Sequence, residues 1–176
     1  MSATSHWGLT PRQSIEAECA RRGKDAVVAG CIDLLGGREA DPARPADPAG
    51  PADPAGPADA AGRGVTPAGR EVDAGLVMAL GGPAARRVIT GEDKQYWLRV
   101  WAARGLLWAW DDRAGTSITA ALRDEHWRVR EMACKVIARH QVGDALPVVA
   151  EMHDDPVPRV RAAAARALVL LTTASA

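Results

Sequence analysis

The chain has 176 residues, enough for one domain, and its formal net charge at pH 7 is zero. This balance gives no overall field that would attract nucleic acid or an anionic membrane. No run of about 18 apolar residues occurs, which excludes a predicted membrane-spanning helix. The cysteines are Cys19, Cys31 and Cys134, an odd number without a CxxC pair, as is typical of free thiols in a reducing compartment. We expect a soluble, cytoplasmic protein without a membrane partner, and its wealth of Ala, Gly, Pro and Arg is typical of a GC-rich bacterial genome.

Residues 12–37 are predicted to form a pair of short antiparallel helices. The first would start at Ser14 as N-cap and end at Gly23. The second would follow directly, carry most of the apolar side chains of this region, and end at the glycine pair of residues 36–37. We expect the pair to cap the rest of the fold.

Residues 40–70 are predicted to be a disordered insertion. The sequence repeats PADPAG with drift, and frequent proline removes backbone donors and blocks helix formation. Almost no large apolar side chain is present to offset the cost of ordering the segment. Two interpretations stay open: expanded low complexity without a function, or a recognition motif for a proline-binding domain.

Residues 71–176 are predicted to form an array of helix pairs, after a short helix that starts near Arg70 and ends at Gly81. Each pair has a shorter first helix, a turn with an aspartate, and a longer second helix. The first helices are expected at roughly 83–90, 114–122 and 144–152. The second helices are expected at roughly 94–109, 126–140 and 156–172.

This array repeats with a period of 31 residues. Three sets of positions fall in register, one of Asp, one of Arg and one of Ala: Asp93, Asp124 and Asp155; Arg99, Arg130 and Arg161; Ala102, Ala133 and Ala164. A fixed period of this size is typical of a stacked helical repeat rather than of a single closed core. The alanines would let neighbouring second helices approach closely, beside a core arc that Leu98, Val129 and Val160 share.

The repeated motif resembles the HEAT repeat: Asp, then Val-Arg from the fifth position, then Ala three positions after the Arg. Its short period resembles the phycobilin-lyase-type HEAT-like subclass. The motif is clear at Asp124 and Asp155 and weaker at Asp93, where Leu98 replaces valine. The resemblance implies an all-α fold, a short α-solenoid of HEAT-like helix pairs. It also implies an Asp–Arg ladder along the stack, formed by Asp93, Arg99, Asp124, Arg130, Asp155 and Arg161.

A neighbouring arc of the second helices carries cationic and aromatic residues. In register these candidate groove residues are Trp97, Arg104 and Trp108, then Arg128, Lys135 and Arg139, then Arg159 and Arg166. In HEAT-like proteins the second helices line the concave face, so the resemblance implies a basic groove with tryptophan at one end. Such a groove would bind nucleic acid or an acidic protein segment. The alternative is a solvated helix edge, with both tryptophans packed under the preceding helices.

No catalytic motif is present: the chain has no GxSxG, no Walker-type loop and no HExxH, and its histidines lack metal-ligand spacing. We predict no catalytic residue, metal or cofactor, and a non-catalytic protein-interaction scaffold or adaptor as the function. One alternative is a nucleic-acid-binding module related to HEAT-like alkylpurine DNA glycosylases, because these use Trp and Asp in the groove and residues 108–112 read WAWDD. The other alternative is a bilin-lyase-like accessory enzyme, on the resemblance alone.

Overall fold

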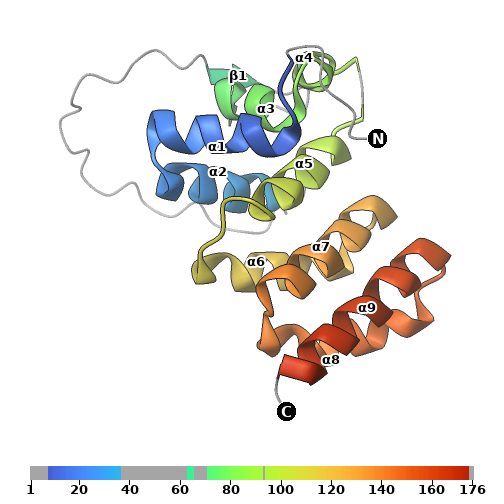
Figure 1. Ribbon diagram of the computed structural model, residues 1–176. Helices are drawn as coiled ribbons and strands as arrows, with labels where there is room; N and C mark the ends of the chain where they lie inside the picture. The colour runs from blue at the N-terminus through green and yellow to red at the C-terminus, as the bar shows by residue number, and fades with distance from the viewer. Residues whose placement is uncertain (1–7, 37–62, 66–70, 93, 175–176) are drawn as a thin grey trace, which may run out of the picture.

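The computed structural model describes residues 8–36, 63–65, 71–92 and 94–174. In these ranges the chain forms nine α-helices, four short 3-10 helices and one two-stranded sheet (Figure 1). The helices are α1 (Pro11–Arg22), α2 (Lys24–Gly36), α3 (Ala74–Gly81), α4 (Ala84–Ile89), α5 (Tyr96–Leu106), α6 (Gly115–Ala120), α7 (Trp127–His140), α8 (Leu146–Glu151) and α9 (Pro158–Ala174). The strands are β1 (Arg63–Val65) and β2 (Glu71–Asp73), and the 3-10 helices are Asp112–Ala114, Ala121–Arg123, Gly143–Ala145 and Met152–Asp154.

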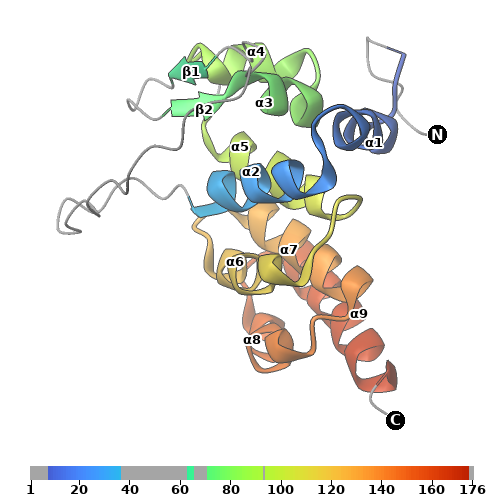
Figure 2. The ribbon, with the colours of Figure 1, turned by 90° about the vertical axis from the view of Figure 1, so that its left-hand side faces the viewer.

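The predicted all-α solenoid is confirmed. Helices α5, α7 and α9 are the expected second helices and pack side by side in one row (Figure 1). The shorter α6 and α8 form a second row beside them, and α8 packs on α9 as α6 packs on α7 (Figure 2). The 3-10 helices extend α6 and α8 at both ends, so each first helix is shorter than predicted but covers the same stretch of chain.

The first helix of the first pair lies elsewhere than the sequence predicts. Residues 83–90 do form a helix, α4, but the row of α6 and α8 is continued by α2, which packs on both α5 and α6 (Figure 2). The reason is burial: α2 has 13 residues and places Val27, Val28 and Cys31 at 0% exposure, whereas α4 has six residues. The N-terminal helices are therefore packed against the repeats, with α1 on α2 and α3.

The N-terminal helix begins earlier than predicted. Thr10, not Ser14, is the N-cap of α1, and Pro11 occupies its first turn. The Thr10 hydroxyl accepts from the Gln13 backbone N–H at 3.3 Å, while the Gln13 side chain accepts from the Thr10 N–H at 2.9 Å. This reciprocal capping box outcompetes a start at Ser14, whose hydroxyl instead donates to the carbonyl oxygen of Ala79 at 2.7 Å.

A two-stranded hairpin replaces the predicted start of the helix near Arg70. Strands β1 and β2 pair antiparallel, with Gly64 opposite Val72. Helix α3 then begins at Ala74, because the Asp73 carboxylate caps it by accepting from the Leu76 backbone N–H at 2.8 Å. Strand β1 lies within the insertion predicted for residues 40–70, and the remainder of that insertion is outside the described residues.

The core follows the predicted arcs. Ala102, Ala133 and Ala164 are each 0% exposed, which is why successive second helices pack closely. Leu98, Val129 and Val160, the predicted core arc beside them, are also buried, with exposures of 4%, 0% and 0%. A second close approach occurs at Gly105, which is in register with Val136 but faces α2 and α3. A β-carbon at Gly105 would lie 2.7 Å from Leu80 Cδ2 and 2.9 Å from Cys31 Sγ.

We expect Gly105→Val to lower the free energy of unfolding by about 1–3 kcal/mol, although valine is the residue that the next repeat has there. The added side chain would force Leu80 and Cys31 out of their packed positions, since both are fully or almost fully buried. Urea unfolding followed by circular dichroism measures the change. Gly143→Val is the control, because a β-carbon at Gly143 meets nothing within 4 Å. Equal losses in the two variants would contradict the close approach.

Candidate interaction surface

Successive repeats are joined by paired arginine and aspartate side chains. Arg99 donates to both carboxylate oxygens of Asp124, from Nε at 2.6 Å and from Nη2 at 3.1 Å. Arg130 donates to Asp155 with the same atoms and the same two distances. Both pairs are largely removed from water, with side-chain exposures of 11% and 6% in the first and 12% and 3% in the second. Such bidentate, desolvated pairs fix geometry strongly.

The aspartates also shape the turns that precede the second helices. Asp124 Oδ1 accepts from the His126 backbone N–H, and Asp155 Oδ1 accepts from the Val157 backbone N–H, each at 2.8 Å. Burial alone would raise the pKa of the Asp155 carboxyl, but the bonds from Arg130 and Val157 outweigh burial and lower this pKa.

Arg130 and Arg161 also bond to backbone carbonyls in the turn of their own repeat. Arg130 Nη1 donates to the carbonyl oxygens of Asp124 at 2.8 Å and Glu125 at 3.0 Å. Arg161 Nη1 repeats this pattern on Asp155 and Pro156, at 2.7 and 3.2 Å. Arg161 is exposed and has no carboxylate partner among the described residues. Asp93, the first aspartate of the predicted ladder, lies outside the described residues.

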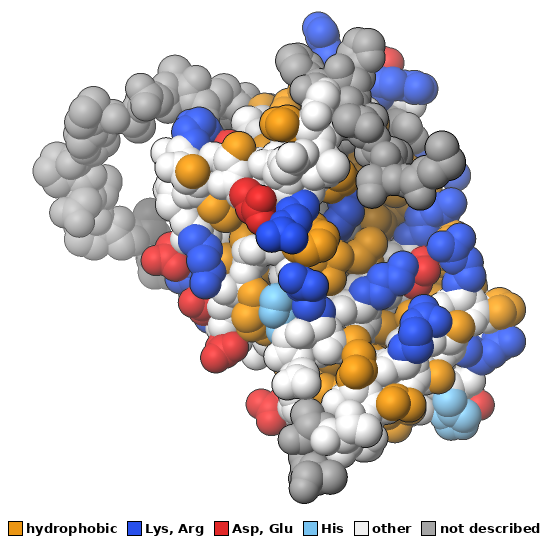
Figure 3. Space-filling model, in the orientation of Figure 1, with side chains coloured by type: hydrophobic (Ala, Val, Ile, Leu, Met, Phe, Trp, Pro, Cys, Tyr) orange, Lys and Arg blue, Asp and Glu red, His pale blue; other side chains and the backbone are white. Residues whose placement is uncertain are grey.

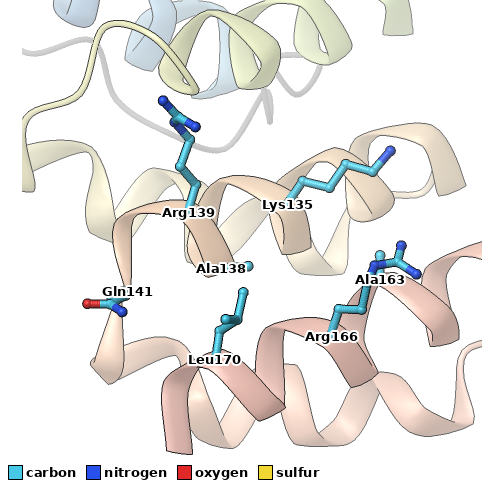
Figure 4. A pocket seen from close by; sticks show the side chains of 7 residues that line it. All are labelled: Lys135, Ala138, Arg139, Gln141, Ala163, Arg166 and Leu170. Atoms are coloured by element: carbon cyan, nitrogen blue, oxygen red, sulfur yellow. The ribbon is translucent and has the colours of Figure 1, made fainter. Parts of the chain in front are cut away.

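A shallow open groove of about 470 Å³ runs between α7 and α9. Its lining consists of cationic, small and aliphatic side chains, with one amide: Lys135, Arg139, Arg166, Ala138, Ala163, Leu170 and Gln141. Figure 4 shows Leu170 of α9 pointing toward Ala138 of α7, whereas the side chains of Lys135, Arg139 and Arg166 extend away from this contact. The groove therefore combines an aliphatic floor with a cationic rim.

The charges on this face are unbalanced. Figure 3 shows Lys and Arg side chains gathered on the half of the face that α7 and α9 form, with few acidic side chains between them. Glu131 is one carboxylate there, and it pairs with Lys135 at 2.9 Å and with Arg159 at 3.4 Å. Burial would raise the pKa of Glu131, but these two cations lower it overall. Arg139 and Arg166 have no carboxylate partner within the described residues.

The tryptophans of the predicted groove are covered by arginine. The Arg128 guanidinium lies over Trp127 at 4.4 Å and over Trp97 at 5.4 Å, and Arg159 lies over Trp127 at 5.3 Å. These contacts form a chain of alternating cations and rings across α5, α7 and α9.

Trp108 has the same kind of cover. Arg139 lies over its ring at 4.7 Å and Arg12 of α1 lies over it at 5.5 Å. The Trp97 ring also stacks against the Trp101 ring, with ring centroids 5.9 Å apart. Trp97 and Trp108 are half-buried with arginines over their rings, so the structure does not show the open stacking platform predicted at one end of the groove.

Arg104 does not lie in the groove, although it is in register with Lys135 and Arg166. Its guanidinium turns toward α3 and donates to the carbonyl oxygen of Leu80, and its buried Nε has no hydrogen-bond partner in the described part of the chain. Burial lowers the pKa of Arg104. The cause is position: α3 packs on α5, and the groove side of the first repeat is thereby closed.

The WAWDD segment is internally satisfied. Trp110 Nε1 donates to Asp112 Oδ1 at 3.1 Å, and the Trp110 ring stacks on His140 with centroids 4.4 Å apart. His140 also contacts the carbonyl oxygen of Leu106 at 2.9 Å. In the described part of the chain, no three His, Cys, Asp or Glu side chains gather so that they could hold a metal ion.

Sequence reasoning missed three contributors to this face: Trp127, Glu131 and Arg12. The spacing of Glu131 and Lys135 by four positions in a helix was a usable signal for their ion pair. Trp127 directly precedes a groove arginine, but the adjacent position on a helix points to another face, so its contact with Arg128 depends on the side-chain rotamers. Arg12 reaches Trp108 from a distant part of the chain, and no local pattern indicates that contact.

Helix pairs stacked in register and tied by a repeated Asp–Arg ladder define an α-solenoid of tandem repeats. The family model for HEAT repeats matches residues 84–169, so this part of the chain consists of HEAT repeats. No curated protein and no solved structure matches it. None of the helices in the described ranges is long and apolar enough to cross a lipid bilayer.

Proposed function

We propose that this HEAT-repeat protein is a non-catalytic interaction scaffold that binds a protein partner on the face of α7 and α9. The observation that carries the proposal is the groove, in which Arg139 and Arg166, cations without a carboxylate partner among the described residues, stand beside an exposed leucine. Leu170 is 46% exposed and the neighbouring Val169 is 60% exposed. An apolar patch with a charged rim is the usual anatomy of a protein interface.

The alternatives have less support from the same residues. Binding of single-stranded nucleic acid gains much of its affinity from bases stacked on open aromatic rings, whereas Trp97, Trp108 and Trp127 have arginines over them. An accessory enzyme needs a positioned nucleophile or an acid–base pair. The side chains that line the groove are those of Lys, Arg, Gln, Ala and Leu, and their arrangement suits binding.

The test is affinity capture from a nuclease-treated native lysate with the full chain as bait. We expect the double variant Arg139→Glu/Arg166→Glu to lose captured partner proteins at least tenfold, because both reversals repel a ligand that the wild-type rim attracts. The control is Arg86→Glu/Arg87→Glu, which makes the same charge change on exposed positions of α4. Unchanged circular dichroism spectra verify that each variant is folded.

Two outcomes would overturn the proposal. If the groove variant captures the same proteins as the wild type, this face is not the binding surface. If nuclease treatment removes every captured protein from the wild-type sample, the direct ligand is nucleic acid.

A further inference from the structure

The face of α7 and α9 presents cations at three levels, because equivalent residues of successive repeats align across it. The second and third levels line the groove, and the first lies beyond its lining. Arg128 of α7 stands opposite Arg159 of α9 at the first level, since these positions are one period apart. The pairs Lys135 with Arg166 and Arg139 with Leu170 form the second and third levels in the same way. This face thus has two doubly cationic levels, of which the second lines the groove, followed by a level in the groove that is half aliphatic.

The helical rise sets the distance between these levels. Seven residues separate Arg128 from Lys135 along α7, which corresponds to about 10.5 Å. Four residues separate Lys135 from Arg139, which corresponds to about 6 Å. A ligand that uses all three levels must carry its complementary groups at these distances.

The first level is held in place before any ligand arrives. The guanidinium groups of Arg128 and Arg159 both lie over the Trp127 ring, at 4.4 and 5.3 Å from its centroid. Arginines restrained in this way lose less side-chain entropy on binding than free ones. Both residues lie in the first turns of their helices, where the helix dipole also favours an anion.

The charge balance selects an anionic ligand. The three levels contain five cations, Arg128, Lys135, Arg139, Arg159 and Arg166, and Glu131 is the carboxylate that pairs among them. Glu131 is only 8% exposed and is already shared by Lys135 and Arg159. A ligand with two carboxylates would meet cations that Glu131 leaves unneutralised.

The third level selects an aliphatic group. Leu170 and Ala138 face each other there, and Ala163 continues the floor toward the second level (Figure 4). An aliphatic side chain inserted at this point would remove its own apolar surface and that of Leu170 from water. Phosphodiester backbones have no such group, so the floor favours a peptide over a nucleic acid.

We propose that the groove binds an extended acidic segment of a partner protein, in which two carboxylates about 10 Å apart are followed by an aliphatic side chain. This inference rests on the scaffold function proposed above. An extended chain advances about 3.3 Å per residue, so the carboxylates stand three residues apart and the aliphatic residue two residues beyond. Side chains alternate along an extended chain, so the two carboxylates point to opposite sides, one toward α7 and the other toward α9, and each of the first two levels offers a cation on both helices. The acidic end points toward the N-termini of α7 and α9.

The experiment is fluorescence polarisation with a fluorescein-labelled decapeptide in a Gly/Ser frame. The probe has two glutamates three positions apart and a leucine two positions after the second glutamate. Three control peptides have glutamines for the glutamates, alanine for the leucine, or the same residues in shuffled order. A single-stranded oligonucleotide of the same length serves as the nucleic-acid probe.

We expect the glutamine peptide to bind at least tenfold more weakly than the acidic probe, and the alanine and shuffled peptides at least threefold more weakly. Among full-chain variants, Arg166→Glu should weaken the acidic probe at least tenfold and Leu170→Ser at least threefold. Arg86→Glu should leave binding unchanged. Raising the salt concentration should also lower the affinity of the wild type for the acidic probe, since most contacts are ionic. This loss of affinity should exceed the loss that Leu170→Ser causes.

Equal binding of the acidic and glutamine peptides overturns the inference, as does tighter binding of the oligonucleotide. If Leu170→Ser binds the acidic probe with unchanged affinity, the proposal that the ligand inserts an aliphatic side chain is wrong. The acidic probe could show no binding while Arg139→Glu/Arg166→Glu still captures fewer lysate partners than the wild type. That result would support the scaffold function and reject the acidic segment as its ligand. If neither responds, both proposals fall.

Discussion

Replacing Arg130 by alanine is expected to lower the free energy of unfolding by about 3 kcal/mol. Arg130 joins the middle and last repeats through two bonds to Asp155, and it ties its own turn through the carbonyls of Asp124 and Glu125. Its removal leaves the Asp155 carboxylate, only 3% exposed, without its counter-ion. Breaking one side of a buried ion pair typically costs about 3–5 kcal/mol, and the Val157 N–H that still reaches Asp155 keeps the loss at the lower end.

Arg161→Ala is the matched control. Arg161 occupies the equivalent position in the last repeat and makes the same bonds to two backbone carbonyls, but it has no carboxylate partner among the described residues. Its loss should cost about 0.5–1.5 kcal/mol, the value of ordinary hydrogen bonds at an exposed site. Urea unfolding of both variants measures the difference. Equal losses in the free energy of unfolding would show that the ion pair is not the source of the ladder's stability.

The same pair makes this difference depend on pH. Because the fold lowers the pKa of Asp155 below the unfolded value of about 3.9, the carboxylate stabilises the native state above that value. This contribution is lost as the pH falls through the folded pKa. The gap between wild type and Arg130→Ala should therefore be largest near pH 7 and narrow as the pH falls. In the variant, burial without Arg130 raises the pKa of the Asp155 carboxyl, so its protonation relieves the variant first, and the wild type loses its own contribution below about pH 4.

The sequence predicts the two C-terminal repeats well because the relevant contacts recur with the period. The Asp–Arg contacts between repeats need only the register of Asp124 with Asp155 and of Arg99 with Arg130, and both registers are visible in the chain. Burial of the alanines follows from the same period. Where a repeat lies between two other repeats, its residues have the same surroundings as the equivalent residues of those repeats. A prediction made for one repeat therefore holds for the next.

The first repeat departs from prediction because its neighbours are not repeats. Arg104 has the register of Lys135, but it meets the end of α3 and the carbonyl of Leu80 instead of an open groove. Gly105 has the register of Val136, but it faces Leu80 and Cys31. Both differences are set by non-local packing of α2 and α3, for which the chain has no periodic signal.

The arginine cover of the tryptophans was also beyond sequence reasoning. A register places Trp97 beside Arg128, but whether the ring stays open or receives the guanidinium depends on the side-chain rotamers and on competing partners. Near Arg128 no carboxylate within the described residues takes the guanidinium, so the nearby rings become its contacts. Of the predicted cations of α7 and α9, Lys135, Arg139 and Arg166 line the groove, whereas Arg128 and Arg159 lie over the Trp127 ring.

Trp101→Ala is expected to have the second large effect, a loss of about 3–5 kcal/mol in the free energy of unfolding. Trp101 is 5% exposed and lies against the last turn of α3, where a β-carbon at Gly81 would come within 2.6 Å of its ring. The positions in register, Met132 and Ala163, are much smaller, so the ring is specific to the junction between α3 and α5. Met132→Ala, at a half-buried position, should cost clearly less in the same urea titration.

A double-mutant cycle separates this junction from a general core effect. Gly81→Ala alone should destabilise, because its methyl group would overlap the Trp101 ring, which has no room to move within the packed junction. In the Trp101→Ala background the same methyl group enters the vacated space, and alanine is also the better helix former by up to about 1 kcal/mol. Gly81→Ala should therefore become neutral or stabilising there, with a coupling energy of about 1–3 kcal/mol. Additive effects of the two substitutions would show that Trp101 does not lie over Gly81, and that α3 is held to α5 by other contacts.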